Sequence, residues 1–235
     1  MTLKNQKVVI VGGSAGIGLA LAKAAALQGA EIVVASRSQE KIERATSEIS
    51  GAVEGYTVDV VNEQSIKSLF EKVGEFDHLV TTPGDPLTFA EFLQADTLHV
   101  KETFDVKFWG QYLCAKHGAA RISRNGSITF MSGSGGASRG TSTLACINGA
   151  TEALCKSLAV ELAPVRVNVV RPGMIDTDAW SNFPEPERQE MYRTVGEGLL
   201  VKRTGTVEEV ADTYLYLLMS RFTTGTAITI DGGAM

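Results

Sequence analysis

The chain has 235 residues, which favours one large domain over two. Apolar residues make up 44% of it and charged residues 21%, so the composition excludes a disordered chain and supplies a sizeable core. The 22 basic and 27 acidic residues give a net charge of −5, which argues against a surface that binds nucleic acid or an anionic membrane.

The sequence also argues against a signal peptide, a membrane span and a metal or disulfide framework. The first apolar run, residues 8–11, is too short for the core of a signal peptide, and no run approaches the ~18 apolar residues of a membrane span. Cys114, Cys146 and Cys155 show no CxxC spacing, and the three histidines show no metal-ligand spacing. We therefore expect a cytoplasmic protein that binds no metal, nucleic acid or membrane.

Short β-rich runs alternate with amphipathic helical runs along the whole chain. The expected strands are Lys7–Val11, Glu31–Ala35, Val53–Val58, Phe76–Thr82, Ser127–Ser132, Val165–Val170 and Ala227–Ile230. The expected helices are Ile17–Gln28, Gln39–Ile49, Glu63–Val73, Lys101–Arg121, Ser142–Leu162 and Val207–Met219. Continuous apolar strands in this alternation predict one α/β domain, a doubly wound parallel sheet of the Rossmann type with three layers.

One stretch, Pro172–Val201, does not follow the alternation. It holds Pro184 and Pro186, and we expect an irregular insertion on the substrate side of the domain. Long loops in compact domains are often lids over a site, although a simple surface excursion would give the same pattern.

A glycine-rich turn follows the first expected strand and opens the first expected helix. Gly12, Ser14, Gly16, Ile17 and Gly18 lie in this turn. Glycines let the backbone approach a pyrophosphate, and the helix N-terminus offers free N–H groups with a partial positive charge. The strand before the turn and the helix after it make a dinucleotide site more credible than a merely tight turn.

The end of the second expected strand indicates which dinucleotide is bound. An NAD-binding chain would place an acidic residue there to accept the adenosine 2′-hydroxyl, but this chain has Ser36, Arg37 and Ser38. A guanidinium between two hydroxyls suits a 2′-phosphate, because arginine offers paired donors to a dianion. We therefore predict NADP(H) as the cofactor.

Together these motifs resemble the short-chain dehydrogenase/reductase family, and the resemblance extends over nearly the whole chain. Besides the glycine turn, it rests on the pairs and turns that follow later strands: Asp59, Val60, Thr82, Pro83, Gly84, Pro172, Gly173, Ile175 and Thr177. In the family the first of these segments contacts the adenine and the last holds the nicotinamide carboxamide, so the resemblance implies that these residues bind the cofactor here.

The catalytic residues of the family do not carry over. Members use Asn, Ser, Tyr and Lys, with the Tyr as acid and base, but alignment on the helix around Glu152 places Leu144 at the Tyr and Asn148 at the Lys. The family's Asn position holds Lys107. Leucine cannot donate a proton, so the resemblance implies an enzyme with a non-standard donor.

Two residues are the catalytic candidates. Ser132 closes the fifth expected strand, although Ser134 would also fit, because a smooth alignment puts Gly133 at the serine position. Lys107 would reach the cofactor ribose or the reacting oxygen from another helix. It could act as an acid if its pKa were lowered, or as a fixed positive charge that stabilises an oxyanion. The alternative is that Lys107 is an ordinary surface charge.

Several other polar residues are weaker candidates. Arg139, Ser142 and Thr143 could replace the donor, and Asp176, Asp178 and Trp180 could face the substrate. Tyr112 and Lys116 also spell Tyr-xxx-Lys, but they lie before the fifth expected strand and match the motif by chance.

These observations predict an NADP(H)-dependent oxidoreductase that acts on the carbonyl or alcohol of a small molecule. A non-redox enzyme of this fold (a cyclase, isomerase or lyase) and a non-catalytic NADP(H)-binding protein are the alternatives. Family members assemble through two long helices and the C-terminal segment, so we expect a homodimer or homotetramer. Phe104, Phe108, Tyr112 and Leu158 would contact the partner, although burial within one subunit would explain the same residues.

Overall fold

The computed structural model describes residues 2–135 and 138–234, and these form a parallel sheet of seven strands. The strands are β1 (Lys7–Val11), β2 (Glu31–Ser36), β3 (Val53–Thr57), β4 (Phe76–Thr81), β5 (Ile122–Met131), β6 (Arg166–Pro172) and β7 (Ala227–Ile230). Their order is β3-β2-β1-β4-β5-β6-β7 with every neighbouring pair parallel, which confirms the predicted doubly wound fold.

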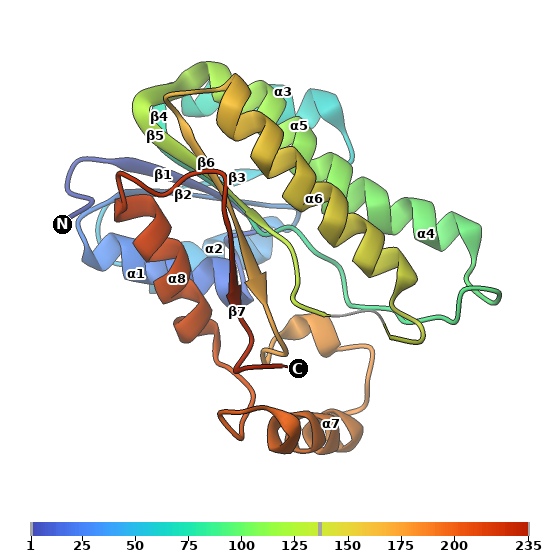
Figure 1. Ribbon diagram of the computed structural model, residues 1–235. Helices are drawn as coiled ribbons and strands as arrows, with labels where there is room; N and C mark the ends of the chain where they lie inside the picture. Colours follow the sequence, from blue (N-terminus) through green and yellow to red (C-terminus); the bar gives the residue numbers. More distant parts are fainter. Residues whose placement is uncertain (1, 136–137, 235) are drawn as a thin grey trace.

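Helices cover both faces of the sheet and give the expected three layers (Figure 1). One face packs against α1 (Gly16–Leu27), α2 (Gln39–Glu48) and α8 (Val207–Met219), and the other against α3 (Glu63–Val73), α5 (Gly110–Gly118) and α6 (Ser142–Glu161). Side chains of β1 alternate between the two cores, with Val8 and Ile10 in one and Val9 and Val11 in the other. Burial on both faces explains why the strand sequence is continuously apolar.

The strand order reverses at β1, which is paired with β2 on one side and β4 on the other. Val11 at the end of β1 lies opposite Ala35 and Thr81 in the two pairings. The chain leaves β1 and β4 toward opposite faces of the sheet, and such a switch point leaves a crevice beyond the carboxyl ends of the strands.

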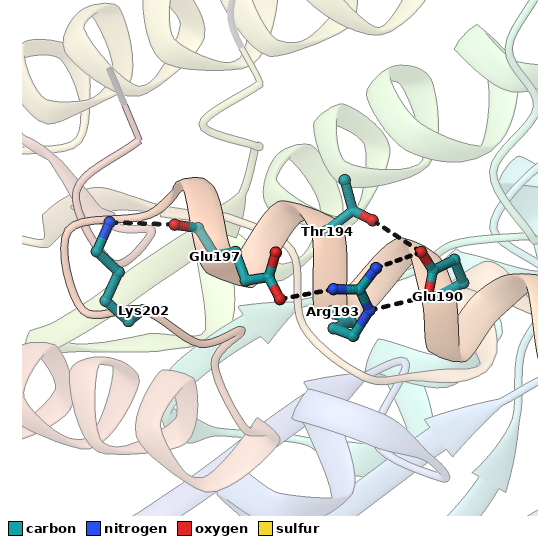
Figure 2. Close-up of polar contacts among 5 residues, drawn as sticks. All are labelled: Glu190, Arg193, Thr194, Glu197 and Lys202. Carbon is teal, nitrogen blue, oxygen red and sulfur yellow. Dashed lines mark hydrogen bonds and ion pairs between the residues drawn. The ribbon is translucent and has the colours of Figure 1, made fainter.

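The stretch expected to be irregular contains a short 3₁₀ turn, η3 (Asp178–Trp180), and a helix, α7 (Glu185–Gly198). Pro184 precedes α7 and Pro186 lies in its first turn, where proline does not interrupt a helix. Arg193 stabilises the exposed face through ion pairs with Glu190 at 2.5 Å and Glu197 at 2.6 Å, as Figure 2 shows. The two prolines therefore mark the start of a helix and not a loop.

The long helix expected over Lys101–Arg121 begins earlier and is interrupted. Its parts are α4 (Thr97–Phe104), the π-helical turn η1 (Asp105–Trp109), α5 and the 3₁₀ turn η2 (Ala119–Arg121). Lys107 lies at the centre of η1, and π-helical turns within helices are frequently found at functional sites. Among the described residues, no helix combines the length and apolar character needed to cross a bilayer.

Candidate cofactor-binding and active site

A cleft of about 1140 Å³ lies at the carboxyl ends of the strands. The expected site residues that line it are Gly12, Ser14, Gly16, Ile17, Gly18, Ser36, Arg37, Ser38, Val60, Thr82, Pro83, Gly84, Lys107, Ser132, Pro172, Gly173, Ile175 and Thr177. Asp59 is the exception, because its carboxylate instead accepts a hydrogen bond from the N–H of Val61 at 3.2 Å and holds the turn after β3. Seven separate segments of the sequence thus meet in one cleft.

The glycine turn has the shape that a pyrophosphate requires. Gly12 has a φ of +92°, and a Cβ there would lie 2.6 Å from the carbonyl oxygen of Thr82. A Cβ on Gly18 would lie 2.3 Å from the carbonyl oxygen of Gly12, so both positions demand glycine. Ala15, at the N-cap of α1, has no side-chain oxygen for the first N–H groups of the helix. These donors face the cleft and suit an anion.

The end of β2 presents one guanidinium to the cleft beside two hydroxyls that already have partners. Ser14 donates to Ser36 at 2.8 Å, and Ser38 caps α2 by accepting from the N–H of Lys41 at 3.2 Å. The Arg37 side chain is 59% exposed and forms an ion pair with Asp85. Arg37 is thus the charged and exposed member of this trio, and its partner Asp85 was not among the expected site residues.

Lys107 points from η1 into the cleft. Its Nζ would lie 3.1 Å from a Cβ built on Gly84, so the ammonium lies against the turn that follows β4. Burial lowers the pKa of Lys107, while the nearby carboxylate of Asp85 acts in the opposite direction. The resulting group is a cation inside the cleft that gives up its proton more readily than a surface lysine.

Gln111, one turn after Lys107, joins three elements at the base of the cleft. Its Nε2 donates to the carbonyl oxygens of Lys107 at 2.6 Å and Met131 at 2.9 Å. Its Oε1 accepts from the N–H of Met131 and the hydroxyl of Thr81, both at 2.9 Å. This buried amide fixes the backbone of Lys107 to the ends of β4 and β5. Gln111 was not among the expected site residues, although a glutamine among apolar residues one turn after Lys107 is a signal that the sequence contains.

Ser132 is held from the far side of the cleft. Its hydroxyl donates to Glu152 of α6 at 3.2 Å, and the same carboxylate lies 3.0 Å from Nε of Arg171 at the end of β6. The alternative, Ser134, also lines the cleft, and its N–H donates to the carbonyl of Pro172 at 2.9 Å. Glu152 and Arg171 therefore orient the Ser132 hydroxyl, and the sequence analysis missed both.

Both positions of the missing Tyr-xxx-Lys pair line the cleft. Leu144 and Asn148 lie on α6, and Nδ2 of Asn148 donates to the carbonyl of Gly133 at 3.3 Å. Of the other donors considered, Arg139 is paired with Glu91 at 3.2 Å on the exterior. Tyr112 packs against Trp109 on the exposed side of α5. The two α6 positions expected to correspond to the family's Tyr and Lys therefore both face the cleft.

Apolar side chains form the outer wall of the cleft, where the loop after β4 meets the segment after β6. The N–H of Leu87 donates to the carbonyl of Ala179 at 2.7 Å, and the rings of Phe89 and Trp180 stack with their centroids 6.0 Å apart. The apolar lining comprises Leu87, Phe89, Leu144, Met174, Trp180, Phe183, Met191, Val195 and Leu199. This end of the cleft suits an apolar molecule.

Replacing Gln111 tests its role in holding the base of the cleft. Gln111→Leu leaves the polar groups of Lys107, Met131 and Thr81 without their partner in the interior, so we expect the free energy of unfolding to fall by ~3 kcal/mol. Urea denaturation measures the change. Gln189→Leu is the matched control, because Gln189 lies on the exposed face of α7 and bonds only to Glu185 in the described structure. Equal losses in the two variants would contradict the assignment.

The chain is similar over almost its full length to known enzymes. The family model described as "Enoyl-(Acyl carrier protein) reductase" matches residues 11–235. The short-chain dehydrogenase/reductase ATR9 of Stachybotrys chlorohalonatus is 32% identical, and the match covers 99% of this chain and 98% of that relative. The crystal structure of a small-chain dehydrogenase in complex with NADPH is 33% identical with a TM-score of 0.83, and the match covers 98% of each chain. The MalC reductase/Diels-Alderase of Malbranchea aurantiaca has a TM-score of 0.91 at 25% identity, covering 98% of this chain and 96% of that one. This chain belongs to the short-chain dehydrogenase/reductase family.

Proposed function

We propose that the protein is an NADP(H)-dependent oxidoreductase that acts on a carbonyl or alcohol with a lysine in place of the family's tyrosine. The observation that carries the proposal is the cleft itself, which places Arg37 at the end of β2 and the ammonium of Lys107 against Gly84 at the end of β4. One cation is available for a 2′-phosphate and the other for the reacting oxygen.

The residues of the cleft fit each part of the cofactor. The turn of Gly12 and Gly18 offers backbone N–H groups to the pyrophosphate, and Arg37 offers paired donors to the 2′-phosphate. Val60, Thr82, Pro83 and Gly84 would line the adenosine and ribose portion. Pro172, Gly173, Ile175 and Thr177 would hold the nicotinamide end, as their positions after β6 suggest.

When bound, the nicotinamide ring supplies or accepts the hydride. Lys107 contributes the positive charge that stabilises the oxygen of the substrate as negative charge develops on it. Because burial lowers its pKa, Lys107 is also better suited than an exposed lysine to transfer its proton to that oxygen. Ser132 offers a hydroxyl on the opposite side, oriented by Glu152.

The apolar outer wall supports a substrate with an apolar body attached to its carbonyl or alcohol. We also propose that the protein forms a homodimer or homotetramer, because Trp109 and Tyr112 expose aromatic surface on η1 and α5. The cytoplasmic location expected from the sequence stays a prediction.

The cofactor preference is tested by thermal and chemical unfolding with each dinucleotide. At 100 times its Kd, NADPH should add about 2.7 kcal/mol to the free energy of unfolding, and NADH at the same concentration should add less. Arg37→Asp should reverse the order, because a carboxylate repels the 2′-phosphate and accepts the 2′-hydroxyl. Arg44→Asp, an exposed change on α2, is the control. No stabilisation by either dinucleotide would overturn the proposal.

The role of Lys107 is tested by the pH dependence of carbonyl reduction. The ammonium is charged below its pKa, so kcat/KM should fall as the pH rises through that lowered value. Lys107→Met should lower kcat/KM by about 100-fold, and Lys107→Arg should retain the charge and remove the alkaline decline. Lys116→Met is the control, since Lys116 is exposed beside Glu63. A Lys107→Met variant with unchanged kcat/KM would refute the role, and turnover without net consumption of NADPH would favour a non-redox reaction.

Restoring the usual acid tests whether the cleft is otherwise competent. The double variant Leu144→Tyr, Asn148→Lys should raise carbonyl reduction by about 100-fold, because positioned proton transfer contributes at least this much. NADPH absorbance follows the reaction. Tyr112→Phe should leave activity unchanged, since that ring packs on the exterior. A folded double variant that binds NADPH without any gain would show that the cleft does not orient a carbonyl.

A further inference from the structure

Two ion pairs join separate segments that line the cleft. Arg37, at the end of β2, is paired with Asp85 in the loop after β4. Lys41, in the first turn of α2, lies with its Nζ 4.0 Å from Oδ2 of Asp178 at the start of η3. All four residues line the cleft, so each cation is matched with a carboxylate from the opposite wall.

Both cations lie where a 2′-phosphate is expected. Arg37 and Lys41 flank the N-terminus of α2, whose partial positive charge also favours an anion. The side chains of Arg37 and Lys41 are 59% and 50% exposed, so a ligand can reach them without disturbing the core. A dianionic phosphate would therefore compete with the two carboxylates for the same donors.

We propose that Lys41 is a second ligand of the 2′-phosphate, beside Arg37, and that Asp85 and Asp178 compete with the phosphate for these two cations. The two carboxylates therefore reduce the preference of this protein for NADP(H) over NAD(H). This inference rests on the proposed binding of NADP(H). Asp85 has the larger effect, because it contacts the guanidinium directly while Asp178 lies 4.0 Å from the ammonium. The carboxylates lower the affinity of the protein for a nucleotide with a 2′-phosphate. They leave its affinity for a nucleotide with a free 2′-hydroxyl unchanged or higher, since Asp85 can accept a hydrogen bond from that hydroxyl.

The structure also offers a matched control in the same loop. Glu91 is an exposed acid that is paired with Arg139 at 3.2 Å, and it does not line the cleft. Removing its charge changes the net charge of the protein by the same amount as removing that of Asp85. Both variants therefore share any long-range electrostatic effect on the binding of an anionic ligand. A change in affinity that is seen only on replacing Asp85 is a local effect of its carboxylate.

The experiment uses two nucleotide probes that differ at the 2′ position, 2′,5′-ADP and 5′-ADP, titrated by calorimetry. Asp85→Asn should lower the Kd for 2′,5′-ADP by about fivefold, the factor expected for an exposed ion pair, and should leave 5′-ADP unchanged or more weakly bound. Asp178→Asn should give a smaller shift in the same direction. Lys41→Met should weaken 2′,5′-ADP alone, and Glu91→Gln should affect neither probe.

Two outcomes would overturn the inference. If Asp85→Asn changes both Kd values by one factor, or weakens 2′,5′-ADP, the carboxylate does not compete with the phosphate. If Lys41→Met leaves 2′,5′-ADP binding unchanged, Lys41 is not its ligand. These results are distinct from failure of the proposed function, in which the unaltered protein binds neither NADPH nor NADH.

Discussion

The close contact between the turn after β1 and the end of β4 is the constraint on which the site depends. Thr82 donates its N–H to the carbonyl of Val11 at 2.7 Å, and its carbonyl leaves room at Gly12 for a hydrogen atom but not for a methyl group. This contact is made where the strand order reverses, so the first N–H groups of α1 and the loop after β4 face the same crevice. Larger residues here would separate β1 from β4 and open the cradle that suits a pyrophosphate.

Charge is distributed along the cleft in a way that the family resemblance does not imply. Arg37 and Lys41 are at the end expected to hold the adenosine, and Lys107 is at the inner end, against Gly84. Asp85 connects the two regions, because it pairs with Arg37 and also favours the charged form of Lys107. Positive charge therefore lies at two separate places along the cleft, and a carboxylate lies between them.

The π-helical turn shows how the chain accommodates a lysine at the family's asparagine position. Gln111 bonds to the carbonyl of Lys107, to both backbone groups of Met131 and to the hydroxyl of Thr81, so one side chain joins η1 to the ends of β4 and β5. Burial of the Gln111 amide has only a small free-energy cost, because its N–H groups and its oxygen all have hydrogen-bond partners. The same arrangement directs the ammonium into the cleft instead of toward solvent.

The sequence by itself determined the alternation of strands and helices, because it follows from local hydrophobic periodicity. It also determined the glycine turn and the absence of an acid at the end of β2, because both are read directly from neighbouring residues. Alignment on α6 also predicted Leu144 and Asn148 as the counterparts of the family's Tyr and Lys. The helix α7 was not expected because two prolines indicated a loop, although Pro184 and Pro186 lie at its start, where proline is compatible with a helix. Only the tertiary structure revealed what Gln111, Asp85 and Glu152 do at the site. Each bonds there to a residue 20 or more positions away, namely Met131, Arg37 and Ser132, and such long-range contacts leave no periodic trace in the sequence.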